Sequence, residues 1–83
     1  MIYVYAIVSL VDSRIYVGQT QDVKKRLTEH NKGSTKSTKG YIPWKLFFYE
    51  TYENRDQARI KEKYWKSGIG KEKLKLLLQK MAL

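Results

Sequence analysis

The sequence predicts a small α+β domain in which a three-stranded antiparallel β-sheet is flanked by helices, in the order β-β-α-β-α-α. Two observations lead to this fold class. Three stretches are rich in β-branched and aromatic residues, and three others begin with capping residues or repeat apolar residues at helical spacing. The length of 83 residues fits one domain over residues 1–83.

The first two strands are expected to form a hairpin. Residues 2–9 are β-branched and aromatic, and residues 15–17 continue this pattern until Gly18 closes it. A turn over residues 11–14 joins the two strands. Side chains alternate between the faces of a strand, so an even-numbered loop places Tyr5 and Tyr16 on one face and an odd-numbered loop separates them.

The middle of the chain predicts a helix, a loop and a third strand. The helix begins at Thr20 or Asp22 and ends near Asn31. Residues 32–42 are rich in Gly, Ser, Thr and Lys, and we expect no core residue among them. Residues 44–51 are almost continuously apolar, which predicts a strand covered on both faces and central in the sheet.

Two helices are predicted at the C-terminal end. Asn54 followed by Gln57 is typical of a capping box and predicts a helix over residues 55–66, which Gly68 and Gly70 are expected to end. A third helix follows from about residue 71. Its apolar stripe consists of Leu74, Leu77, Leu78 and Met81.

Composition excludes several kinds of site. The absence of Cys excludes disulfides and thiolate metal sites, and a single His excludes a His-rich zinc site. No apolar run approaches the roughly 18 residues of a membrane span. The N-terminus has no basic segment typical of a signal peptide. We therefore expect a cytoplasmic protein without a membrane partner.

The net charge of +9 is concentrated in two segments. Residues 24–45 and 59–83 each carry +6, and each contains a Tyr and a Trp. Lysines attract phosphates and aromatic rings stack on bases, so this pattern indicates a nucleic-acid partner. The alternatives are a solvated charged surface and two Trp residues that belong to the core. The expected DNA contacts are Lys24, Lys25, Lys32, Lys36, Lys39 and Lys66.

The first predicted helix carries polar residues on its apolar face. Arg26 and His30 lie within an arc of about 100° that also contains Val23 and Leu27. A cation at the margin of a core needs an anion. That anion is either an internal carboxylate or the phosphate of a ligand.

A carboxylate lies in the apolar stripe of the second helix, where Glu62 falls between Ala58 and Trp65. It needs an Arg, a Lys or a metal ion as its partner. One carboxylate suits Mg²⁺ when a substrate supplies phosphate oxygens. With Tyr5, Tyr16, Arg26 and His30, Glu62 completes a set that contains a proton acceptor, a phosphate clamp and a metal ligand.

These residues resemble the GIY-YIG nuclease family, and more narrowly its small stand-alone, excinuclease-like members. The resemblance covers residues 2–75. It rests on five stretches: Tyr3-Val4-Tyr5, Tyr16-Val17-Gly18-Gln19-Thr20, Arg26-Leu27-Thr28-Glu29-His30-Asn31, Pro43-Trp44-Lys45-Leu46 and Lys66-Ser67-Gly68-Ile69-Gly70-Lys71, together with Glu62.

The resemblance implies an endonuclease that hydrolyses DNA, in preference to RNA, with one Mg²⁺ or Mn²⁺. It makes Tyr5 and Tyr16 the motif tyrosines, Arg26 the phosphate contact, His30 the helix histidine and Glu62 the metal ligand. Cleavage is expected to depend on DNA structure rather than sequence unless a partner protein supplies specificity. The alternatives are a non-catalytic nucleic-acid-binding module and an accessory subunit that binds through the leucine stripe.

The sequence also departs from the family pattern. Tyr3 stands where the first motif has Gly, and Val17 stands where the second motif has Ile. No Asn follows Glu62 to support the site from a later position.

Overall fold

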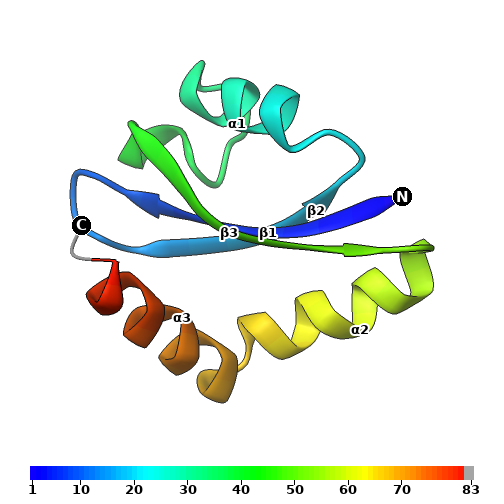
Figure 1. Ribbon diagram of the computed structural model, residues 1–83. Helices are drawn as coiled ribbons and strands as arrows, with labels where there is room; N and C mark the ends of the chain where they lie inside the picture. Colours follow the sequence, from blue (N-terminus) through cyan, green and yellow to red (C-terminus); the bar gives the residue numbers. More distant parts are fainter. Residues whose placement is uncertain (82–83) are drawn as a thin grey trace.

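The computed structural model describes residues 1–81. A three-stranded antiparallel sheet lies between one helix on one face and two helices on the other (Figure 1). The predicted fold class and element order are confirmed. The elements are β1 (Ile2–Ser9), β2 (Ile15–Thr20), α1 (Val23–Asn31), the 3-10 turn η1 (Lys39–Tyr41), β3 (Trp44–Tyr52), α2 (Arg55–Lys66) and α3 (Gly68–Lys80).

The central strand of the sheet is β1, because the strand order is β2-β1-β3. The expectation that the third strand would be central is therefore wrong. A register shift between Ala6 and Ile7 makes Phe47 an extra residue in β3. Phe47 and Phe48 consequently pack against the same core although they are neighbours in sequence. The continuous apolar run reflects this bulge on an edge strand.

The hairpin of β1 and β2 places the two motif tyrosines together. Ile7 pairs with Tyr16, and Tyr5 pairs with Gly18, which corresponds to the even-numbered loop. The rings of Tyr5 and Tyr16 are 6.5 Å apart between centroids. A Cβ atom on Gly18 would lie 2.7 Å from the Tyr5 hydroxyl, so only glycine leaves room for this phenol.

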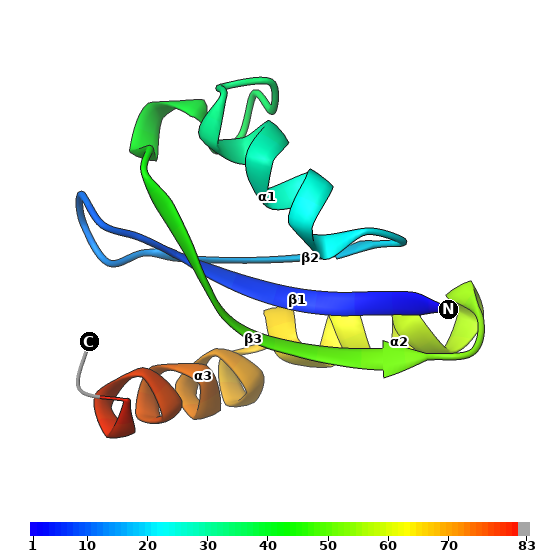
Figure 2. The ribbon, with the colours of Figure 1, turned by 45° about the horizontal axis from the view of Figure 1, so that its top comes forward.

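Side chains alternate between the two faces of β1, so this strand contributes to two cores. Val4, Ala6 and Val8 face α2 and α3, whereas Tyr5 and Ile7 face α1. Figure 2 shows from a second angle that α1 and the α2–α3 pair lie on opposite faces of the sheet. A strand that supplies both cores is buried along nearly its whole length.

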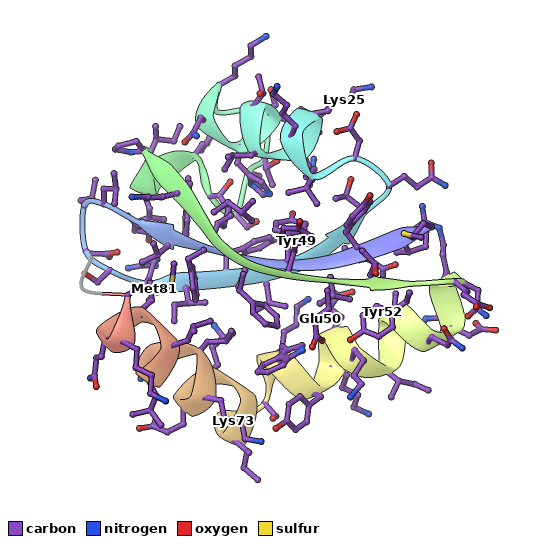
Figure 3. All side chains as sticks on the ribbon, viewed as in Figure 1. Lys25, Tyr49, Glu50, Tyr52, Lys73 and Met81 are labelled. Carbon is purple, nitrogen blue, oxygen red and sulfur yellow. The ribbon has the colours of Figure 1, made fainter. Side chains whose placement is uncertain are left out.

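Both tryptophans take part in packing, which agrees with the core alternative. Trp44 is 4% exposed and lies in the core beneath α1. The ring of Trp65 lies 4.8 Å from that of Phe48, and its Nε1 donates to Glu50 at 3.2 Å. Glu50 also accepts a hydrogen bond from Tyr52, and both side chains lie on the side of β3 toward α2 (Figure 3). The Glu50 carboxylate thus joins β3 to α2.

The leucine stripe of α3 serves the fold. Leu74 is 1% exposed, and Leu77 and Leu78 pack against the same core. Met81 alone of the stripe is exposed. The stripe is therefore occupied by the sheet, which removes the surface that the accessory-subunit alternative requires. Within residues 1–81, no helix has the length and apolar character needed to cross a membrane.

Capping explains where the helices begin. Asp22 accepts a hydrogen bond from the Lys25 amide at the start of α1, and Asn54 accepts one from the Gln57 amide at the start of α2. The prediction for α3 needs a correction. Ser67 caps α3 by accepting from the amide of Gly70, so Gly68 and Gly70 form the first turn of α3 instead of a terminator.

The segment between α1 and β3 is more ordered than its composition predicts. Thr38 is fully buried, and Tyr41 and Ile42 pack against the core beneath α1. The side chain of Asn31 donates to the carbonyl of Trp44 at 3.0 Å and accepts from its amide at 2.7 Å. The expectation that nothing in residues 32–42 contributes to a core is wrong, because the segment folds over the end of α1.

The close approach of α2 and α3 gives a first prediction. A Cβ atom on Gly70 would lie 2.2 Å from the backbone oxygen of Tyr64, whereas one on Gly68 would meet nothing within 4 Å. We expect Gly70→Ala to lower the free energy of unfolding by about 1–3 kcal/mol, since backbone must move. Urea denaturation should show Gly68→Ala unchanged or slightly more stable. Equal stability of the two variants would contradict this packing.

Candidate active site

Of the five predicted site residues, Tyr5, Tyr16 and His30 are in direct contact, and Arg26 and Glu62 lie within electrostatic range of Tyr5. His30 is hydrogen-bonded to the Tyr5 hydroxyl at 2.8 Å, and the rings of Tyr16 and His30 are 5.1 Å apart between centroids. Arg26 and Glu62 are both close enough to influence the pKa of Tyr5. The structure therefore brings together residues from β1, β2, α1 and α2.

Tyr5 is protonated at neutral pH. Its side chain is buried, and this burial raises its pKa to about 12, with the charges of Tyr16 and Glu62 acting in the same direction. The guanidinium of Arg26 opposes this shift. A phenol with such a pKa gives up its proton only when an acceptor lies in contact with it.

His30 is the side chain hydrogen-bonded to this phenol, and it is fully buried. Its Nε2 lies 2.8 Å from the Tyr5 hydroxyl, and its Nδ1 lies 2.8 Å from the hydroxyl of Thr38. Burial, with a contribution from the charge of Arg26, lowers the pKa of His30. The ring is thus neutral at pH 7 and acts on the site through Tyr5.

Arg26 lies at the margin of the site with part of its guanidinium exposed. Its Nη1 donates to the Glu29 carboxylate at 3.0 Å, so an internal carboxylate is the anion that Arg26 meets in this structure. A half-exposed pair one turn apart on a helix is weak. Arg26 can therefore exchange Glu29 for the oxygens of a phosphate. An arginine can form bidentate hydrogen bonds with such a group.

Glu62 is held between α2 and β2. Its Oε1 accepts from Gln19 Nε2 at 2.7 Å, and its Oε2 pairs with Lys66 Nζ at 2.7 Å. Gln19 in turn accepts from Arg55 at 3.2 Å. The partner of Glu62 in this structure is thus a lysine, and the side chain of Glu62 is 18% exposed.

Three residues of the site were not singled out by the sequence. Gln19 directly follows the second motif, and this position is its only signal. Arg55 lies seven residues before Glu62, so helical periodicity places both on one face of α2. Thr38 gave no signal, because its segment has the composition of an exposed loop.

A shallow hollow adjoins these groups at the edge of β2. Its volume is about 360 Å³, and it is lined by Gln19, Thr20, Gln21, Asp22, Lys25, Arg26, Glu29 and Arg55. Three of these residues are cations. Two others, Asp22 and Glu29, are carboxylates, so the lining carries one net positive charge, and Gln19 connects the hollow to Glu62.

The predicted DNA contacts are all exposed. Lys24 and Lys25 lie on α1, and Figure 3 shows Lys25 on the outer side of that helix. Lys66 lies at the end of α2, where it pairs with Glu62. The other three, Lys32, Lys36 and Lys39, lie on the segment that follows α1.

The donor set is compatible with one divalent cation. Within residues 1–81, no three His, Cys, Asp or Glu side chains form a group that could hold a metal. Mg²⁺ is commonly held by one or two carboxylates, with waters and substrate phosphates as the other ligands. Glu62 fits this mode as a partly exposed carboxylate whose partner Gln19 lines the hollow, provided that Lys66 or Gln19 gives up its carboxylate oxygen to the cation.

Comparison with known proteins identifies the family. The chain matches the GIY-YIG catalytic domain over residues 1–75. It belongs to the GIY-YIG family. The resemblance deduced from the motifs is thereby confirmed, and a GIY-YIG domain is a nuclease-type domain that acts on nucleic acids.

Similar GIY-YIG proteins occur in distant organisms. The UPF0213 protein CPE1444 of Clostridium perfringens is 38% identical over 96% of this chain and 86% of its own length. The UPF0213 protein HQ_3675A of Haloquadratum walsbyi is 39% identical over 89% of this chain and 83% of its own. The UPF0213 protein SAG0778 of Streptococcus agalactiae is 33% identical over 93% of this chain and 88% of its own length. No solved structure gives a significant match.

Tyr3 and Val17, the two residues that depart from the GIY-YIG motifs, pack at some distance from the Tyr5 hydroxyl. Tyr3 packs edge-on against Tyr49 with 5.9 Å between ring centroids. These two rings border a hollow on the α1 side of the sheet that also includes Lys24. Val17 lies in the core beneath α2 and α3. Neither change alters the contacts of Tyr5 with His30.

The state of His30 gives a second prediction. Its lowered pKa means that the unfolded chain binds a proton more readily below the ordinary His value of 6.5. The stabilisation by the neutral ring is therefore complete above pH 6.5 and is lost as the pH falls. We expect an NMR titration of this single histidine to give a pKa below 6.5.

The variant His30→Gln serves as the control for this pH dependence. Between pH 7.5 and 5 the melting temperature of the wild type should fall more than that of His30→Gln, since carboxylates titrate in both. A histidine that titrates at or above 6.5, or equal pH dependence of the two proteins, would refute a buried neutral His30.

Proposed function

We propose that this GIY-YIG protein is a divalent-metal-dependent endonuclease that hydrolyses DNA phosphodiester bonds and responds to DNA structure rather than sequence. The observation that supports this most is that Arg26 and Glu62, from two different helices, both lie near enough to Tyr5 to influence its pKa, while Arg26 also lines a hollow together with Lys25 and Arg55. Mg²⁺ or Mn²⁺ is the proposed cofactor, with Glu62 as its protein ligand.

Water activation is assigned to the Tyr5–His30 pair. A water molecule gives a proton to the Tyr5 oxygen while Tyr5 passes its own proton to His30 Nε2, across the 2.8 Å hydrogen bond. The resulting hydroxide attacks the phosphorus, the P–O bond to the leaving oxygen breaks, and the alkoxide that departs takes a proton from solvent water. No free phenolate forms, so the high pKa of Tyr5 is no obstacle to its role as a base.

Arg26 and Glu62 contribute to stabilising the negative charge on the phosphate. Arg26 leaves its weak pair with Glu29 and binds the phosphate oxygens. A divalent ion bound to Glu62 would supply further positive charge to the phosphate. Tyr16 packs against His30 and holds the ring of the proton acceptor in place.

A non-catalytic nucleic-acid-binding module is the second candidate. It is favoured by the contacts of Glu62, since both carboxylate oxygens already have partners within the chain. In that case Glu62 serves only to join α2 to β2. For both the endonuclease and the binding module, we propose that a partner protein supplies specificity for particular DNA sites.

The enzyme proposal predicts the behaviour of Glu62→Gln. The amide keeps the size of the side chain and loses the charge that holds a cation. Loss of a metal contribution worth several kcal/mol should lower cleavage by about 100-fold or more. Single-stranded, duplex and branched DNA should each be assayed with Mg²⁺ and with Mn²⁺.

Glu72→Gln is the matched control, because Glu72 is exposed on α3. It should cleave like the wild type. If the wild type binds DNA and cleaves none of these substrates, the binding module is correct. If Glu62→Gln unfolds the protein, Glu62 is a structural residue.

DNA binding by the cationic side of α1 gives a further prediction. Each phosphate contact that is lost lowers the salt dependence of binding by about 0.9 in the slope of log K against log salt. The double variant Lys24→Gln/Lys25→Gln should therefore lower this slope by up to about 2. Fluorescence anisotropy with labelled DNA measures it.

Lysines on the opposite side of the molecule provide the control. Lys73 lies on α3, far from Lys25 in Figure 3, and Lys80 lies at the end of the same helix. Lys73→Gln/Lys80→Gln should leave the slope unchanged. Equal effects of the two double variants would indicate attraction by net charge without a defined DNA-binding face.

A further inference from the structure

We propose that Thr38 is a positioning residue for the reaction. Its buried hydroxyl holds His30 in the tautomer whose Nε2 can receive the proton of Tyr5. This inference rests on the proposed function, since it assigns a role in the same proton transfer. Thr38 lies in a segment whose composition predicts an exposed loop, and no motif includes it.

Thr38 is anchored from several directions. It is fully buried, whereas Lys36, Ser37 and Lys39 around it are exposed. Its amide donates to the carbonyl of Thr35 at 3.1 Å, and its own carbonyl accepts from Trp44 Nε1 at 2.9 Å. The backbone on both sides of the hydroxyl is therefore fixed.

The hydroxyl of Thr38 has two polar neighbours. It lies 2.8 Å from Nδ1 of His30 and 3.4 Å from the carbonyl oxygen of Thr35. A carbonyl can only accept a hydrogen bond. Donation of the Thr38 proton to Thr35, whose carbonyl also accepts from the amides of Thr38 and Lys39, leaves the Thr38 oxygen to accept from Nδ1–H of His30, and this is the arrangement that we infer.

This direction determines the rest of the chain of hydrogen bonds. With its proton on Nδ1, neutral His30 presents a lone pair at Nε2, and Tyr5 donates to it at 2.8 Å. The opposite arrangement places the proton on Nε2 and directs the Tyr5 proton elsewhere. The Arg26 guanidinium also interacts with the Tyr5 hydroxyl, but it can only donate, so within residues 1–81 His30 is the acceptor available to the Tyr5 proton. Only the first arrangement gives every buried hydrogen an acceptor.

The consequence for the reaction is specific. An imidazole with its proton on Nε2 cannot receive a proton there. Without the Thr38 oxygen, Nδ1–H would be buried without an acceptor, so the proton would move to Nε2. Thr38 thus keeps the proton acceptor of Tyr5 available although it does not touch the substrate.

The wild-type protein tests the tautomer directly. The chain contains one histidine, so long-range ¹H–¹⁵N correlation spectra of its ring need no further assignment. We expect the wild type and Thr38→Ser to carry the proton on Nδ1. Thr38→Val has nearly the same volume without a hydroxyl, and we expect its proton on Nε2. Thr38→Ala serves the same purpose if the valine variant does not fold.

Cleavage assays complete the experiment. Thr38→Val should lower kcat about tenfold or more with KM unchanged, by analogy with other residues that orient a site group, and Thr38→Ser should restore kcat. A proton on Nε2 in the wild type, or an unchanged tautomer or kcat in Thr38→Val, overturns the role of Thr38. Absence of cleavage by the wild type overturns the proposed function instead.

Discussion

The structure depends on the position of β1 in the middle of the sheet. This strand pairs with β2 on one side and β3 on the other, and helices cover both of its faces. Successive side chains therefore enter two different cores. Tyr5 lies on the α1 face, and it shares this face with Tyr16 because the hairpin fixes the register. The contact between Tyr5 and His30 follows from that register.

At the edge of β2, side chains from the helices on both faces of the sheet come close together. Arg26 and His30 come from α1 above the sheet, and Glu62 and Arg55 come from α2 below it. Gln19 of β2 binds both Arg55 and Glu62, so it fixes the side chains of α2 at this edge. An edge strand leaves one side unpaired, and this permits groups from both faces to approach one phosphate.

Local signals in the sequence predicted most of the fold. Capping by Asp22 and Asn54 depends on contacts within a few residues, so the starts of α1 and α2 could be placed in advance. The strand order and the start of α3 could not. The apolar run that suggested a central third strand comes from a bulge at Phe47 on an edge strand, and α3 begins at Ser67, a cap followed by two glycines that also suit a helix end.

The same distinction applies to the site. The motif tyrosines, Arg26, His30 and Glu62 could be selected from spacing and family resemblance. The role of Thr38 depends on a segment that folds back over α1, which no periodicity reveals. Glu62 was expected to need a cationic partner, and the partner in the structure is Lys66, four residues away on the same helix.

The central claim is that the edge of β2 holds one divalent ion at Glu62. Paramagnetic broadening of backbone amide signals by increasing Mn²⁺ tests this claim most directly. Our account predicts that signals of Gly18, Gln19 and Glu62 broaden first, and that Glu62→Gln removes this preference. Broadening that begins instead at the acidic residues Glu50, Glu53 and Asp56, or that is uniform over the chain, would contradict it.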